Sequence, residues 1–229
     1  MFVKDQMTPD PITVAPDIPI IEAQQKMQRH NIRHLPVVDQ GNHVVGLLTR
    51  ETMLQAVPWS QSALSTLETQ YILSKIKAGK VMIQDVITIT EDVAVEEAAR
   101  IMVDKKIGCL PVVRNEALIG IITDIDLLAT TMEMLGARRP GLRLSVLVPY
   151  RPGEIARLTS AIAGINGNVT AFGTWEGALD PISGVPQKMG IVARVGGIAK
   201  EQLVATVEKL AEIEILDVRE MENREMQHA

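Results

Sequence analysis

The sequence predicts an α+β protein built from three small modules: two copies of a β-α-β-β-α unit and one β-α-β-β-α-β unit. Three observations predict this fold, namely an internal repeat in the first half of the chain, hydrophobic periodicity within each copy, and a change of pattern after Gly136. The chain has 229 residues, of which 46% are hydrophobic, so it has enough apolar side chains for more than one core.

The internal repeat begins at Met7 and again at Met82. The segment MTPDPITV, from Met7, aligns with MIQDVITI, from Met82, and the register holds as far as LPVV, which starts at Leu35 and at Leu110. After a one-residue deletion, GLLT of the first copy matches GIIT of the second. Self-similarity over this length indicates a duplicated structural unit.

Each copy predicts the same series of elements. A short β-branched strand precedes an amphipathic helix, whose apolar positions in the first copy are Ile20, Ala23 and Met27. LPVV predicts a buried strand, and a polar turn leads to a further strand and to a helix that starts near Thr49 or Thr123. Because a unit of about 46 residues is too small to bury a core alone, we expect the two copies to pack as a pair.

The third module follows Gly136. Alternating apolar residues from Leu142 to Val148 predict a strand, and a helix, two strands, a second helix and a last strand follow. This order is that of a ferredoxin-like sandwich. We therefore expect a first repeat at 1–57, an amphipathic linker helix at 58–80, a second repeat at 81–136, the third module at 141–221 and a flexible tail at 222–229.

Composition excludes several classes of function. A net charge of −5 and an aromatic content of 3% argue against a nucleic-acid-binding surface. Cys109 is the single cysteine, which excludes a disulfide framework and fits a reducing compartment. The chain has no membrane-spanning segment and MFVKDQMTPD is not a signal peptide, so we expect a cytoplasmic protein. The spacing of His30, His34 and His43 does not suit a metal, and we predict no metal site.

The β-α-β-β-α repeat, the LPVV strand and the segment GIITDID, from Gly120 to Asp126, resemble a tandem pair of CBS domains, known as a Bateman module. The resemblance covers residues 1 to about 135. It implies a regulatory protein that binds an adenosine-containing ligand, such as AMP, ADP or ATP, in the cleft between the repeats. The whole chain is also similar to regulatory proteins of acetoin utilisation.

Thr123 and Asp126 are the candidate ribose-binding residues. An ionised carboxylate can accept hydrogen bonds from both ribose hydroxyls, and the threonine hydroxyl adds a further partner. The alternative is that Thr-x-x-Asp only caps a helix. The first repeat has Thr49 and Thr52 at these positions, and since a hydroxyl grips a diol less well than a carboxylate, we expect a degenerate second site there.

The resemblance also assigns candidates for the rest of the ligand. Aliphatic walls would hold adenine, since neither repeat contains Phe, Trp or Tyr between its first strand and its last helix. The candidate wall residues are Ile87, Ile107, Cys109 and Ile121. The alternative is that these four residues only pack in the core. Arg33 and His34 are the candidate phosphate-binding pair, His34 as a donor when protonated. The alternative for this pair is a solvated basic surface.

In the third module, RPGEIARL and the following GNV resemble an ACT domain, a regulatory module that binds amino acids in many relatives. The resemblance implies an effector region, usually across a dimer interface, at Gly153, Glu154, Ile155, Asn168 and Val169. Arg151 replaces the usual acidic residue of the turn. A ligand-free dimerisation domain is the alternative.

Taken together, these patterns favour a non-catalytic sensor that forms a homodimer and acts on a regulated protein partner. It needs no cofactor other than an adenine nucleotide as regulatory ligand, with an amino acid as a second candidate ligand. The alternative is a ligand-free interaction scaffold with vestigial sites. An enzyme is disfavoured because the sequence has no Walker A, Gly-x-Ser-x-Gly, His-Glu-x-x-His or Cys-x-x-Cys motif.

Overall fold

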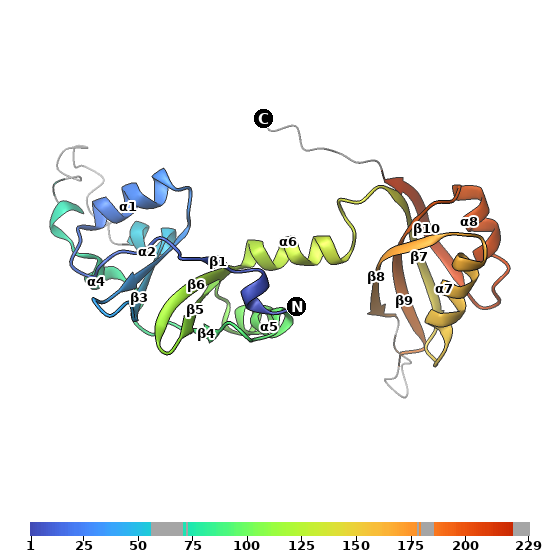
Figure 1. Ribbon diagram of the computed structural model, residues 1–229, viewed down its shortest axis with the longest axis horizontal. Coiled ribbons are helices and arrows are strands. Elements are labelled where there is room, and N and C mark those ends of the chain that lie inside the picture. Colours follow the sequence, from blue (N-terminus) through green and yellow to red (C-terminus); the bar gives the residue numbers. More distant parts are fainter. Residues whose placement is uncertain (56–70, 72, 178, 180–185, 222–229) are drawn as a thin grey trace. The chain divides into compact units, whose positions relative to one another are not determined.

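The computed structural model describes residues 1–55, 71, 73–177, 179 and 186–221 (Figure 1). They belong to two compact units, Met1–Leu128 and Ala129–Ala229. The predicted tail at 222–229 and most of the predicted linker helix lie outside the described residues. Within 71–81, residues 73–75 are helical and the short helix α4 (Ala78–Val81) follows. No helix in the described part of the chain is long and apolar enough to cross a bilayer.

The first repeat is a β-hairpin covered by helices. Strands β2 (His34–Val38) and β3 (Val44–Thr49) pair antiparallel, and the helices are α1 (Ile20–Arg29) and α2 (Arg50–Gln55). The predicted apolar face of α1 is confirmed, since Ile20, Ala23 and Met27 are all buried in the core of this repeat. The predicted strand at 12–14 is reduced to a single parallel bridge from Val14 to Val37.

The second repeat has the same elements in the same order. They are β4 (Ile89–Thr90), α5 (Val95–Lys105), β5 (Cys109–Arg114), β6 (Ala117–Thr123) and α6 (Asp124–Met134). Strand β5 runs parallel to β4 and antiparallel to β6. The core of this repeat is centred on Ala98, Met102, Leu110, Val112 and Ile122.

The segment that leads into each repeat packs on the other repeat. The chain start contains η1 (Val3–Asp5) and β1 (Thr8–Pro9). Val3 is buried in the core of the second repeat, and β1 pairs with β6. In the opposite direction, Ala78 is buried in the core of the first repeat, and Ile83 forms a bridge to β3. The repeats are therefore joined by exchanged segments as well as by contact.

The glycine of the repeated Gly-h-h-Thr segment makes room for these exchanged segments. A β-carbon at Gly120 would overlap the sulfur of Met7 and would lie 3.2 Å from the carbonyl oxygen of Thr8. A β-carbon at Gly46 would overlap the side chain of Met82 in the same way. The repeated glycine thus has a packing cause, which is the close approach of the exchanged methionine.

The second unit is a four-stranded antiparallel sheet with two helices. The elements are β7 (Gly141–Pro149), α7 (Glu154–Gly164), β8 (Asn168–Glu176), β9 (Lys188–Gly196), α8 (Lys200–Val207) and β10 (Glu214–Met221). Their order is the β-α-β-β-α-β order predicted from the sequence, and the strands lie in the order β10-β7-β9-β8. Both helices cover one face of the sheet (Figure 1), where Leu144, Ile191, Leu158 and Leu203 share one core.

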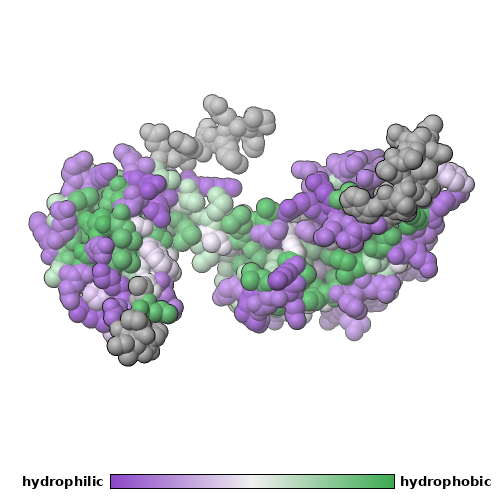
Figure 2. Space-filling model, turned by 180° about the vertical axis from the view of Figure 1, so that it is seen from behind, coloured by the Kyte–Doolittle hydropathy of each residue, from purple (hydrophilic) through white to green (hydrophobic). Residues whose placement is uncertain are grey.

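Hydrophilic side chains cover much of the surface of each unit, with hydrophobic areas between them (Figure 2). In the second unit the exposed hydrophobic side chains include Trp175 and Leu216. Trp175 lies flat against Gly190, where a β-carbon would overlap the indole ring. The sheet of this unit therefore has apolar side chains outside its helix-covered core.

Gly120→Ala should destabilise the first unit by about 1–3 kcal/mol, because the added methyl group overpacks the contact with Met7. Met7→Ala empties the same space, so the double variant should lose less stability than the sum of the two single variants. Urea unfolding followed by circular dichroism measures all three free energies of unfolding. Strictly additive effects would contradict the packing of Met7 on Gly120.

Candidate functional site

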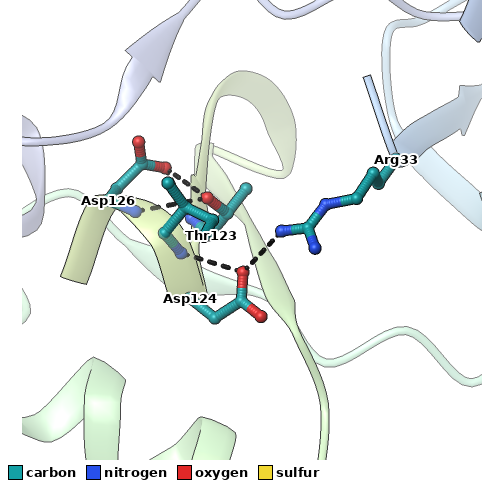
Figure 3. Close-up of polar contacts among 5 residues, drawn as sticks. Arg33, Thr123, Asp124 and Asp126 are labelled. Atoms are coloured by element: carbon teal, nitrogen blue, oxygen red, sulfur yellow. Dashed lines mark hydrogen bonds and ion pairs between the residues drawn. The ribbon is translucent and has the colours of Figure 1, made fainter. Parts of the chain in front are cut away.

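Thr123 and Asp126 form a hydrogen-bonded turn where β6 ends and α6 begins (Figure 3). The backbone N–H and the hydroxyl of Thr123 donate to Oδ2 of Asp126, at 2.8 and 2.7 Å. The N–H of Asp126 approaches Oγ1 of Thr123 at 3.4 Å. This is the reciprocal cap that the sequence offered as an alternative. It holds the carboxylate at the first turn of a helix, where a negative charge is favourable.

The first repeat builds the same turn from two hydroxyls. The N–H of Thr49 donates to Oγ1 of Thr52 at 3.0 Å, and the N–H of Thr52 donates to Oγ1 of Thr49 at 3.2 Å. The geometry of the cap is kept without a carboxylate. The two equivalent positions therefore differ in charge and in the number of hydrogen bonds that they can accept.

Two cavities lie between the repeats of the first unit. The Asp126 cavity has a volume of about 330 Å³; its lining includes Thr123, Asp126, Ile121, Asp10, Ile12 and Ile32. The Thr49 cavity has a volume of about 350 Å³; its lining includes Thr49, Leu47, Asp85, Ile87, Ile107 and Cys109. Arg33 and His34 line both cavities. Each cavity thus contains side chains from both repeats.

The structure divides the four residues that we grouped as one adenine wall. Ile121 lines the Asp126 cavity, whereas Ile87, Ile107 and Cys109 line the Thr49 cavity. The cause is the exchange of segments, which carries Ile87 across to the first repeat. In the aligned repeats, Ile12 and Ile32 correspond to Ile87 and Ile107, and they line the Asp126 cavity. The aliphatic wall beside Asp126 is therefore made of Ile12, Ile32 and Ile121.

A small apolar cluster of Leu47, Cys109 and Ile121 joins the repeats, with Val86 packed against it. Burial, with a smaller contribution from the charge of Asp124, raises the pKa of the Cys109 thiol to about 12. Since the thiolate is the nucleophilic form, Cys109 is unreactive at neutral pH. This environment agrees with a wall residue and not with a nucleophile.

Arg33 and His34 are adjacent to Asp124, to which the sequence analysis gave no role. Nη2 of Arg33 donates to Oδ1 of Asp124 at 3.0 Å, and about half of each side chain is exposed (Figure 3). Burial lowers the pKa of His34; the charge of Arg33 lowers this pKa further, and Asp124 partly opposes both. His34 is therefore neutral at pH 7, and it becomes a second cationic donor only at lower pH or beside an anion that stabilises its protonated form.

Sequence reasoning also missed Asp10 and Asp85, one in each cavity. They occupy equivalent positions in the two repeats, MTPD and MIQD, so the alignment contained a signal. The alignment alone could not assign Asp10 to the Asp126 cavity, because Asp10 lies on the segment that crosses to the second repeat. Asp10 itself has a left-handed backbone, with φ of 45°, and its N–H donates to the carbonyl oxygen of Ile119.

The five residues predicted as an effector region of the second unit do not gather within one chain. Gly153, Glu154 and Ile155 lie at the start of α7, whereas Asn168 and Val169 follow its end. A helix of 11 residues separates the two groups by about 16 Å. Because the ACT resemblance places this effector region across a dimer interface, it stays a prediction.

The first residue of α7 is a buried glutamate that pairs with two arginines. Glu154 is buried, and its carboxylate contacts Arg151 at 2.7 Å and Arg157 at 2.8 Å. Arg151 also contacts Glu212 at 2.6 Å. The arginine that replaces an acidic residue in this turn thus has a structural role, as it neutralises a buried carboxylate. Across the described part of the chain, no three His, Cys, Asp or Glu side chains are grouped as a metal site would need.

Comparison with known proteins identifies the duplicated unit. Residues 3–58 and 78–133 each match the family described as CBS domain. The CBS domain-containing protein YhcV of Bacillus subtilis is 30% identical over 131 residues, which are 57% of this chain and 85% of that protein. The inosine-5'-monophosphate dehydrogenase of Methanocaldococcus jannaschii is 34% identical over 155 residues. The chain spans 28% of that dehydrogenase and 57% of the uncharacterized protein MK0525 of Methanopyrus kandleri.

Similarity to solved structures indicates the same family. A putative acetoin utilization protein (AcuB) from Vibrio cholerae is 31% identical with a TM-score of 0.50, over 59% of this chain and 93% of that one. The CBS domain pair of protein MJ0100, in complex with 5'-methylthioadenosine and S-adenosyl-L-methionine, is 30% identical with a TM-score of 0.50, over 58% of this chain and 97% of that one. With the duplicated fold and the two cavities between its halves already described, these similarities establish that the chain belongs to the CBS-domain family.

Proposed function

We propose that this chain is a non-catalytic regulatory protein that binds an adenosine-containing ligand in the Asp126 cavity. The observation that carries the proposal is a carboxylate, fixed at a helix start beside the Thr123 hydroxyl, that lines a cavity with aliphatic walls. The complex of the MJ0100 domain pair with two adenosine compounds supports this ligand class.

The chemistry of the cavity suits the parts of such a ligand. Asp126 would accept hydrogen bonds from the ribose hydroxyls, since a carboxylate has two acceptor oxygens and a negative charge. Ile12, Ile32 and Ile121 would enclose adenine, and no Phe, Tyr or Trp is among the residues that line this cavity. A volume of about 330 Å³ falls at the small end of the range of ligand pockets.

Arg33 would hold a phosphate by exchanging one anion for another. Its guanidinium contacts Asp124, and both groups are half-exposed, so this ion pair is weak and can be replaced. A phosphate group would then meet the guanidinium and the neighbouring imidazole of His34. Nucleotides with a phosphate should therefore bind more tightly than adenosine.

The Thr49 cavity is proposed as a weaker or differently specific second site. It has the aliphatic walls Ile87 and Ile107, but its turn offers the hydroxyls of Thr49 and Thr52 in place of a carboxylate. The scaffold alternative, in which both sites are vestigial, draws its support from this turn and from the ion pair that occupies Arg33.

For the second unit we propose a ferredoxin-like, ACT-like module that dimerises the protein. The order β10-β7-β9-β8 and the placement of both helices on one face support the architecture. The buried carboxylate of Glu154 at the start of α7, which would repel the carboxylate of an amino acid, favours dimerisation over amino-acid binding. A role in acetoin utilisation, through a regulated protein partner, is supported by the similarity to the Vibrio cholerae protein.

Regulation requires a ligand that binds two arrangements of the protein with different affinity. Helix α6 starts with the turn that contains Asp126, and its later residues belong to the second unit. A ligand that tightens this turn would therefore act at the start of the segment that leads out of the CBS pair.

Asp126→Asn should weaken binding of AMP, ADP, ATP or S-adenosylmethionine at least tenfold, because an amide keeps the cap acceptor but cannot accept from two ribose hydroxyls as a carboxylate does. Asp126→Ala should do so too, with an added loss of about 1 kcal/mol from the cap. Thr52→Ala, at the equivalent position of the first repeat, is the matched control and should change this binding little. Calorimetry on nucleotide-free protein measures the affinities, and failure of all four ligands would favour the scaffold.

Binding of a phosphate-containing nucleotide should tighten as the pH falls from 8 to 6. Burial and the charge of Arg33 lower the pKa of His34, and an adjacent phosphate would raise this pKa again, so the complex would take up protons. Calorimetry in buffers of different ionisation enthalpy measures this uptake. His34→Asn should remove the part of the uptake that the phosphate itself does not account for; an unchanged uptake would exclude His34 from the site.

Amino acids should change the melting temperature of the second unit by no more than about 1 °C. For a unit of this size, such a shift corresponds to a change in the free energy of unfolding of well under about 1 kcal/mol. The physical reason is that the buried carboxylate of Glu154, at the first residue of α7, already pairs with Arg151 and Arg157 and would repel a second carboxylate. A thermal-shift screen of the twenty amino acids on the full chain, with sedimentation velocity to detect the dimer, tests this. A saturable shift with one amino acid would restore the sensor role of this module.

A further inference from the structure

The face of the second unit's sheet opposite α7 and α8 has a row of three arginines. Arg143 on β7 is the direct cross-strand partner of Arg219 on β10 and of Arg194 on β9. Direct partners point to the same face of a sheet. The neighbours of Arg143 and Arg194 along their strands, Leu144 and Val195 among them, belong to the core under the helices, so the arginines point away from it.

This row contains more positive charge than its surroundings neutralise. Oδ2 of Asp217 contacts Nε of Arg219 at 2.7 Å and Nη1 of Arg143 at 3.2 Å, so one carboxylate serves two guanidinium groups. Among the described residues, Arg194 contacts no carboxylate within ion-pair distance. The row therefore has three positive charges and one negative charge.

Arg194 is also buried without satisfied donors. Its exposure is 3%, and its Nε and Nη1 atoms have no hydrogen-bond partner in the part of the chain that the structure describes. Burial lowers the pKa of Arg194, and the charge of Arg143 lowers it further. A guanidinium remains protonated nevertheless, so the protein holds a buried cation next to a second cation.

A purely structural role does not account for this arrangement. Like charges on directly opposite strand positions destabilise a sheet, and a buried donor of a charged group is costly when it lacks an acceptor. A methionine or leucine would fill the same position without either cost. The arrangement is favourable once an anion lies between the two guanidinium groups.

The space around Arg194 is narrow. A β-carbon at Gly136, in the segment before β7, would lie 3.5 Å from Cβ of Arg194 and closer still to Ala171. In the same segment, Nη1 of Arg139 donates to the carbonyl oxygen of Thr170 at 3.0 Å, which adds another cation near this end of the sheet. The segment thus packs against Arg194 and the neighbouring residues of β8.

We propose that Arg194 and Arg143 bind a compact oxyanion, the carboxylate of a small organic acid or a phosphate, on this face of the second unit. Planar guanidinium groups match the oxygens of either anion in paired hydrogen bonds. The bound anion would neutralise the row and hold the segment that contains Gly136 and Arg139 against the sheet. The site is independent of the nucleotide proposed for the CBS pair and of the residues predicted from the ACT resemblance.

Thermal unfolding of the full chain, freed of bound ligands, tests this site. The probes are sodium succinate and sodium phosphate, and the reference is sodium chloride at the same ionic strength. We expect the melting temperature of the second unit to rise with the logarithm of the concentration of at least one oxyanion and not with chloride. Arg194→Met should abolish the shift. It should also raise the melting temperature in oxyanion-free buffer, since it removes an unpaired buried cation, and this shows that the variant folds.

Lys188→Met is the matched control. It lies on the same strand, removes the same charge and affects a side chain that is 47% exposed and paired with Glu214, so it should keep the oxyanion shift. The proposal is overturned if no oxyanion acts differently from chloride, or if Arg194→Met keeps the shift. It is equally overturned if sedimentation velocity shows that Arg194→Met converts a dimer to a monomer without any oxyanion effect, since the acceptor is then a carboxylate of a second copy of this chain.

Discussion

The structure of the first unit depends on the exchange of segments between its two repeats. Neither repeat has enough residues to enclose its own core, and each core is completed by a segment that enters from the other repeat. Val3 closes one core and Ala78 the other. The exchange also explains the repeated glycines, because a side chain at Gly46 or Gly120 would collide with the methionine of the incoming segment.

The same exchange makes both cavities composite. A ligand beside Asp126 would touch residues of the chain start, of the first repeat and of the second repeat together. Its binding free energy would therefore depend on how the two repeats are arranged, which is the condition for a small molecule to shift a conformational equilibrium. A site contained within one repeat could not respond to that arrangement.

Charge is arranged differently in the two units. In the CBS pair, Arg33 is half-exposed and paired with Asp124, a contact that an incoming phosphate can replace at little cost. In the second unit, Arg194 is buried beside Arg143 and has no such partner among the described residues. The first arrangement suits a reversible ligand. The second has positive charge without a neutralising carboxylate, and a bound anion would neutralise it.

The sequence by itself determined the duplication, the element order of both units, the apolar face of α1 and the Thr123–Asp126 turn, because these follow from periodicity and from contacts within a few residues. Only the tertiary structure decided which walls belong to which cavity, since Ile12 and Ile87 reach their cavities by crossing to the opposite repeat. It alone separated Gly153 from Asn168 by the length of a helix. Only the tertiary structure showed that Arg143, Arg194 and Arg219 lie side by side. They come from strands that are distant in sequence, and strand register is not visible in a single sequence.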